Sequence, residues 1–166
     1  MEAATALGAL IVSILAAIIA ARSARASEKS ADVAVRALHR GAVRELIAAC
    51  HGVLEENLRI QSRADELRPL YRTLAIFSGA VGGSVEQELT SRLDGDVTLA
   101  ADRCKEAGSV LAAPTRLVEA SDDDLDNTQV RIESTRLELQ NIRERLQRAQ
   151  ADIAKQIEEH RQRQIR

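Results

Sequence analysis

The sequence predicts an all-α protein: a single N-terminal transmembrane helix, followed by a long-helix bundle or coiled coil with a short-helix head. Apolar residues recur at helical spacing along most of the 166-residue chain, and prolines number only two. Aromatic residues make up 1% of the chain, with one Tyr, one Phe and no Trp. Because β-strands favour aromatic and β-branched side chains, this composition argues against a β-sandwich or barrel.

The charges are balanced along the chain. Lys and Arg total 23 against 25 Asp and Glu, a net charge of −2, and residues 22–120 sum to zero. Non-specific binding of nucleic acid depends on a concentration of bases that neutralise phosphates, and single-stranded nucleic acid also needs aromatic stacking platforms. The sequence therefore predicts no nucleic-acid partner.

An uncharged run covers residues 3–21 and predicts a membrane anchor over residues 1–22. A helix of this length spans about 28 Å, close to the thickness of the hydrocarbon layer. A buried helix of a soluble protein is the alternative, but a small aromatic-poor chain has little with which to cover a helix that is apolar on all sides. The residues assigned to the span are Ala3, Leu10, Ile11, Ile14, Leu15, Ile18, Ile19 and Ala21.

The bases beside this run indicate an anchor and its orientation. No Lys or Arg precedes the run, whereas Arg22, Arg25 and Lys29 follow it. A cleaved signal peptide carries its bases before the apolar stretch, although residues 24–26 fit a small-x-small cleavage site. Since cytoplasmic flanks carry the excess of bases, we expect the N-terminus outside and the rest of the chain in the cytoplasm.

Residues 23–68 are predicted to form a long amphipathic juxtamembrane helix. Apolar residues follow one another in steps of three and four from Ala31 to Leu54. The helix is expected to end near Arg68, because Pro69 disfavours helical geometry in the residue before it. Residues 69–120 are then predicted to form a head of short helices.

Local signals place the elements of this head. Ser84 and Gln87 have the spacing of a capping box. Residues 94–96, Asp-Gly-Asp, are typical of a turn. A last short helix is expected to end before Pro114.

Residues 121–166 are predicted to form a coiled-coil helix capped by Ser121 or Asp122. Apolar residues recur every seventh position, as a coiled coil requires. Half of the seam is polar or small, and Val130 and Leu137 lie off it, so a bundle of more than two helices fits better than an isolated pair. The predicted seam residues are Leu125, Ile132, Leu139, Ile142, Leu146 and Ile153.

The two long segments have similar lengths and suggest a path for the chain. The first helix leaves the membrane, the head reverses the chain, and the last helix returns. Arg161, Arg163 and Arg166 would then approach the inner leaflet. The alternative is that these arginines merely complement the negative end of a helix dipole.

No pattern in the sequence predicts catalysis, a cofactor, a metal site or a small-molecule substrate. Cys50 and Cys104 do not form a disulfide framework and fit buried thiols. A nucleophilic pair would have to combine His51 with Cys104, and no feature of the sequence places them together. The glycines of residues 78–83 lack the Gly-Lys-Ser/Thr ending of a phosphate loop, and residues 94–96 lack the further ligands of a calcium loop.

These observations predict a single-pass, membrane-anchored helical scaffold or tether without enzymatic activity. Its expected partners are the lipid bilayer and either a second copy of the chain or another helical protein. Two alternatives stay open. One is a membrane signalling component that transmits through the coiled coil. The other is an extracytoplasmic helical protein, if the topology is inverted or the N-terminus is cleaved.

Overall fold

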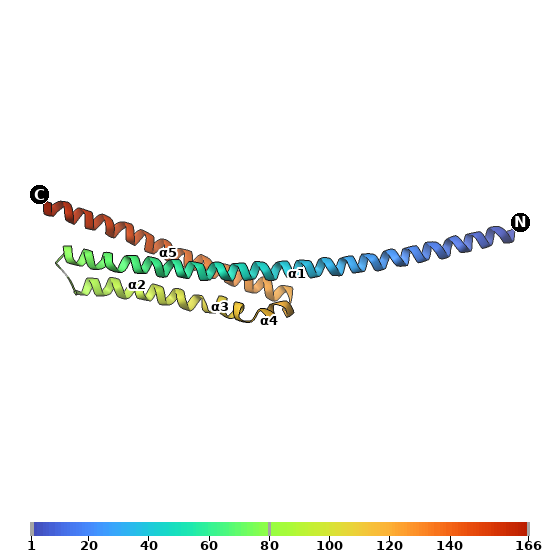
Figure 1. Cartoon of the computed structure of the whole chain (residues 1–166), viewed down its shortest axis with the longest axis horizontal. Helices are drawn as coiled ribbons and strands as arrows, with labels where there is room; N and C mark the ends of the chain where they lie inside the picture. Colours follow the sequence, from blue (N-terminus) through green and yellow to red (C-terminus); the bar gives the residue numbers. More distant parts are fainter. Residues whose placement is uncertain (1, 80, 166) are drawn as a thin grey trace. The chain divides into compact units, whose positions relative to one another are not determined.

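The computed structural model describes the backbone of residues 2–79 and 81–165, and the side chains of residues 19–79 and 81–163. Within these ranges every regular element is a helix, so the all-α prediction is confirmed. Contacts divide the chain into two units, residues 1–41 and residues 42–166. The five helices are α1 (Glu2–Phe77), α2 (Ser84–Arg103), α3 (Lys105–Ala112), α4 (Pro114–Glu119) and α5 (Asp122–Ile165) (Figure 1).

The predicted membrane span lies mainly outside the described side chains. In the part of the chain that the structure describes, no helix carries a stretch long and apolar enough to cross a bilayer. The side chains of residues 3–18 are not among those described, and Ile19 and Ala21 are exposed. The span therefore stays a prediction.

Residues 42–166 form a bundle of three helical layers: the second half of α1, an arm made of α2, α3 and α4, and α5. The arm runs antiparallel to α1, because Arg68 pairs with Asp94 at 2.9 Å and the Cys104 thiol reaches the Val53 carbonyl at 3.8 Å. It also runs antiparallel to α5, since Arg103 pairs with Glu138 and Arg131 pairs with Glu106.

Helix α5 consequently runs parallel to α1, as Figure 1 shows. Arg143 lies 3.5 Å from Glu56, and further along Arg63 donates to Gln150 at 2.9 Å. The predicted return of the last helix, which was to bring Arg161, Arg163 and Arg166 toward the inner leaflet, is therefore wrong for the direction of α5 in this bundle; Arg166 itself lies outside the described residues. The physical reason is that residues 84–119 make a full antiparallel arm, which reverses the chain a second time.

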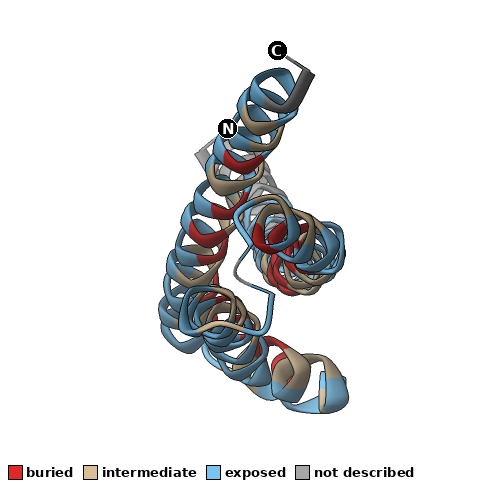
Figure 2. Cartoon of the chain, turned by 90° about the vertical axis from the view of Figure 1, so that its left-hand side faces the viewer, coloured by how far each residue is buried: buried red, intermediate tan, exposed pale blue. Residues whose placement is uncertain are grey.

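The bundle is held by a single hydrophobic core along the facing sides of the helices (Figure 2). All six residues of the predicted heptad seam are at most 6% exposed. They pack inside the same chain, in one cluster with Leu46, Val53, Ile60 and Leu67 of α1 and Leu93 of α2. Full burial of a Leu or Ile side chain stabilises a fold by about 1.5–3 kcal/mol, so this seam contributes substantially to stability.

The predicted end of the first long helix near Arg68 is wrong, because α1 continues through Pro69 to Phe77. Proline removes one helical hydrogen bond and costs about 3 kcal/mol in a helix interior. Leu67 and Tyr71 on either side of it are buried, whereas Pro69 itself faces solvent. Tertiary packing of the flanking residues thus outweighs the local cost.

The predicted turn at residues 94–96 is also wrong, since α2 runs through Gly95. A glycine in a helix costs about 1 kcal/mol relative to alanine. Here Leu93 and Ala100 are buried, and the two acids are engaged by arginines of other helices, Asp94 by Arg68 and Asp96 by Arg145. These contacts keep the segment helical.

One predicted helix cap is confirmed and one is wrong. The Ser121 hydroxyl accepts the Asp124 backbone N–H at 3.2 Å and donates to the Asp124 carboxylate at 2.7 Å, which caps α5. Helix α2 does begin at Ser84, but its N-cap residue is Gly83, which has no side chain to cap the helix. Instead the Glu86 carboxylate accepts the Gly82 N–H at 2.7 Å, on the turn before the helix.

Replacing Pro69 by alanine should stabilise the protein. The substitution restores a backbone N–H inside α1, and the exposed ring gives up little packing, so the free energy of unfolding should rise by about 1–3 kcal/mol. Pro114→Ala is the matched control, because Pro114 stands at the start of α4, where no hydrogen bond is lost. Urea unfolding of both variants measures the difference, and equal effects would contradict this account of Pro69.

Candidate interaction groove

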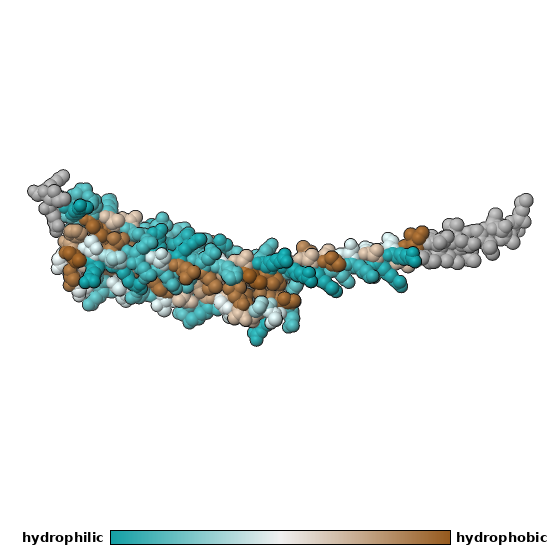
Figure 3. Space-filling view, viewed as in Figure 1, coloured by the Kyte–Doolittle hydropathy of each residue, from teal (hydrophilic) through white to brown (hydrophobic). Residues whose placement is uncertain are grey.

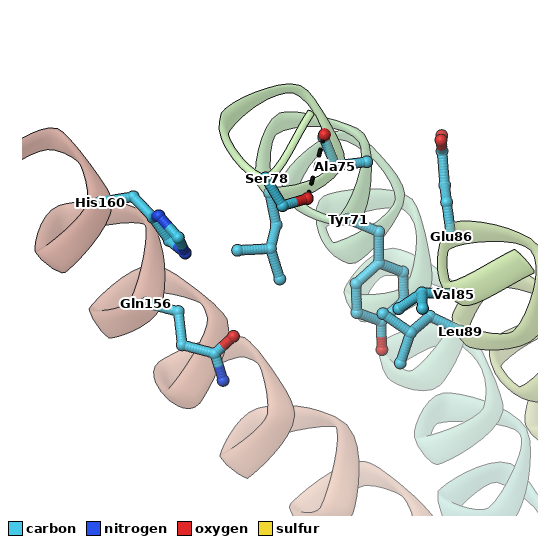
Figure 4. A pocket seen from close by; sticks show the side chains of 9 residues that line it. Tyr71, Ala75, Ser78, Val85, Glu86, Leu89, Gln156 and His160 are labelled. Carbon is cyan, nitrogen blue, oxygen red and sulfur yellow. Dashed lines mark hydrogen bonds between the residues drawn. The ribbon is translucent and has the colours of Figure 1, made fainter. Parts of the chain in front are cut away.

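An open groove lies where the ends of α1, α2 and α5 meet, and its volume is about 270 Å³. Its lining side chains come from all three helices and the turn after α1 (Figure 4). They are Tyr71, Leu74, Ala75 and Ser78 from the α1 end, Val85, Glu86 and Leu89 from α2, and Gln156 and His160 from α5.

The groove exists because the heptad positions of α5 beyond Ile153 are occupied by polar residues. Seven residues beyond Ile153 the seam reaches His160, and fourteen beyond Ile142 it reaches Gln156. Ile153 is buried, whereas Gln156 is exposed and His160 is half-buried. Polar side chains with this exposure do not close the core, so the apolar faces of α1 and α2 stay accessible there.

The chemistry of the groove is an apolar floor with a polar rim. Tyr71 is 6% exposed, and burial raises the pKa of its phenol; the charge of Asp96 raises this pKa further, while Arg92 lowers it. The Ser78 hydroxyl donates to the Ala75 carbonyl at 3.1 Å (Figure 4) and is therefore occupied in ending α1. The rim consists of an amide, an imidazole and the Glu86 carboxylate.

The apolar surface around the groove favours side chains of a protein partner. Large apolar residues on the adjoining α1–α2 hairpin are also exposed, Ile76 by 57%, Val81 by 61% and Val85 by 62%, and hydrophobic surface gathers at this end (Figure 3). Contiguous exposed apolar surface is typical of protein contact sites.

Comparison with family models, curated proteins and solved structures gave no match. Inferences about the function of this chain therefore rest on its own geometry and charge.

The two cysteines lie in the core, away from the groove. Cys50 and Cys104 are free, buried thiols, and His51 is exposed, so Cys104 is not assembled with His51. Burial raises the pKa of both thiols, and the negative charge of Glu106 raises that of Cys50 further. Neither cysteine is an activated thiolate at neutral pH, because activation requires a lowered pKa.

The acidic residues do not form a metal centre in the described part of the chain. No three His, Cys, Asp or Glu side chains gather there. Asp94 and Asp96, the pair with a weak likeness to a calcium loop, each hold an arginine. Their carboxylates are used to dock helices.

The groove lies apart from the residues that the sequence pattern singles out. Arg22, Arg25 and Lys29 of the cytoplasmic flank are exposed on α1, and the six seam residues lie in the core. The signal for the groove was present in the same heptad: the seventh residue after Ile153 is a histidine.

Completing the heptad should close the groove. His160→Leu places an apolar side chain at the next seam position, and we expect the free energy of unfolding to rise by about 1 kcal/mol because that side chain is partly buried. His51→Leu is the control, since His51 is exposed and its replacement should change stability by less than about 0.5 kcal/mol. Denaturant unfolding measures both. Equal values for the two variants would contradict the role assigned to His160.

The thiols should be protected in the folded chain. Reaction with a thiol reagent at pH 8 should be slower in the folded chain than in urea, because burial raises the pKa of both thiols and so lowers their thiolate fraction. With raised folded pKa values, the stabilising contribution is full below the unfolded pKa of about 8.5 and is lost as the pH rises toward the folded pKa. Stability measured from pH 7 to 10 should therefore fall, and a rise would contradict the burial of the thiols.

Proposed function

We propose that the chain is a non-catalytic scaffold or tether anchored to a membrane by residues 3–21. The observation that carries the scaffold role is the groove: the bundle has its own hydrophobic core, and an apolar recess stays open at the end where α1, α2 and α5 meet. An amphipathic helix docks into such a recess through apolar side chains at helical spacing. The partner we propose is another helical protein or a second copy of the chain.

A second surface on α5 is consistent with a protein partner. Val130 and Leu137 are 69% and 60% exposed, stand seven residues apart, and lie on the side of α5 away from its buried seam. Residues seven apart share one face of a helix. The bundle thus offers apolar contacts at more than one place.

The membrane anchor is supported by the sequence. Residues 3–21 carry no charge, and bases follow them but do not precede them. This asymmetry favours an N-terminus outside and the bundle in the cytoplasm.

Fusions after Arg166 test the anchor and its orientation together. A fusion to green fluorescent protein should be fluorescent and membrane-bound, and a fusion to alkaline phosphatase should be inactive. Ile11→Arg with Ile14→Arg should release the chain from the membrane, because each arginine at the centre of a span costs about 3 kcal/mol. Ile11→Leu with Ile14→Leu is the matched control and should stay membrane-bound.

Two results would contradict the proposal. An active phosphatase fusion would place the bundle outside the cytoplasm and favour an extracytoplasmic helical protein. Recovery of the unaltered chain in the soluble fraction would remove the anchor.

A further inference from the structure

A basic stripe runs along the first part of α1, formed by Arg22, Arg25, Lys29, Arg36 and Arg40. The steps between these residues are close to whole helical turns. At about 3.6 residues per turn, the five side chains fall within an arc of about 60° on the helix surface. All five are exposed.

The opposite side of the same helix is apolar and small. Ala24, Ala31, Val35 and Leu38 fall on that side, with Val35 59% and Leu38 75% exposed. Asp32 and Val33 lie about 20° outside this arc, one on each side of it, and Glu28 lies about 60° outside it on the side of Asp32. In Figure 3 hydrophilic side chains follow one edge of this part of the helix and apolar ones the other.

The bases of the stripe form no ion pair with a carboxylate of the described residues. The ion pairs of the bundle between residues 55 and 148 include none of the bases of the stripe. Arginines of the bundle such as Arg68, Arg103 and Arg145 hold carboxylates of other helices, whereas the five bases of the stripe have none among the described residues. Their charge is available to an external anion.

We propose that the basic stripe binds anionic phospholipid headgroups of the leaflet at which the uncharged run ends. The inference rests on the proposed membrane anchor and adds the lipid class that the flank selects. Arg22 directly follows the run, and Lys29 lies about 10 Å further along the helix axis, within about one Debye length of the surface. Bases at such distances attract anionic lipids.

The single-sided arrangement fits a helix that leaves the bilayer at a tilt. Transmembrane helices tilt by about 20° on average, which brings one face of the emerging helix nearer to the headgroups. Bases on that face are then favoured over bases distributed around the helix. Arg36 and Arg40 lie about 21 and 27 Å beyond Arg22 along the axis, so their contribution should be small.

The stripe therefore offers two groups of bases that differ mainly in their distance from the membrane and can be compared. Arg22, Arg25 and Lys29 form a proximal group, and Arg36 and Arg40 form a distal group on the same face. If the stripe binds lipid headgroups, the proximal group should supply most of the binding. An elongated acidic protein laid along the helix would use both groups equally.

Energy transfer in reconstituted vesicles measures the lipid class around the anchor. The full chain carrying Ser27→Cys accepts a donor dye at that exposed position, because Cys50 and Cys104 are buried. Acceptor dye is placed on phosphatidylglycerol or on phosphatidylcholine at equal mole fraction in mixed vesicles of the two lipids. Transfer to phosphatidylglycerol should correspond to about a fivefold local enrichment, the factor contributed by one base near an anionic surface.

The variants then separate the two groups. Arg22→Gln with Arg25→Gln and Lys29→Gln should abolish the enrichment, whereas Arg36→Gln with Arg40→Gln should leave most of it. Salt at about 1 M should remove it in the unaltered chain, since the Debye length falls to about 3 Å. Equal transfer to both lipids in the unaltered chain would overturn the proposal. Equal losses in the two variants would also overturn it, because the effect of a base would then not fall with its distance from the membrane surface.

Flotation of the same vesicles in 1 M salt distinguishes failure of the proposed membrane anchor from failure of the proposed lipid selection. A chain that floats but shows no preference for phosphatidylglycerol keeps its anchor and overturns the lipid selection alone. A chain that fails to float has no anchor, which overturns both.

Discussion

The parallel pairing of α5 with α1 is the constraint on which the bundle depends, and a buried ion pair sets its register. Glu56 is 4% exposed, 2.9 Å from Arg59 on its own helix and 3.5 Å from Arg143 of α5. A carboxylate this far from water is costly unless it is paired. Sliding α5 by one turn would remove Arg143 from Glu56 and leave the buried carboxylate with Arg59 alone. The apolar seam therefore supplies the attraction between the helices, and the second arginine favours one alignment.

Periodicity predicts which face of a helix is buried, and it did so for α5. It carries no information about direction, because a seam from Leu125 to Ile153 packs as well against a parallel helix as against an antiparallel one. Direction was set here by residues 84–119, whose length as an arm depends on α2 continuing through Gly95. That continuation rests on contacts such as Asp94 with Arg68, which join residues distant in sequence. Pro69 and Gly95 predicted helix breaks because residue type reflects only the local free-energy cost of Pro or Gly in a helix. It does not include the tertiary contacts that offset this cost.

The two candidate surfaces were hidden in the sequence for different reasons. The groove follows from extending the seam by one heptad to His160, which is visible only once the seam is known to be buried. The basic stripe disappears when charge is summed over residues 22–120, because acids of the bundle cancel it. Helical position separates these charges, and the structure adds that bundle arginines such as Arg68, Arg103 and Arg145 hold carboxylates of other helices, while the stripe's bases hold none among the described residues.

The register of α1 with α5 also has a consequence for synthesis on the ribosome. Arg63 of α1 meets Gln150 of α5, a partner 87 residues later in the chain. At about 5–20 residues per second, translation supplies that partner about 4–17 s after Arg63 has been made. During this interval the apolar face of α1 is covered at most by the α2–α4 arm, and the nascent chain is exposed to chaperones and proteases. A chain released before α5 is made has lost one of the three walls of its core and is expected to be degraded or to aggregate.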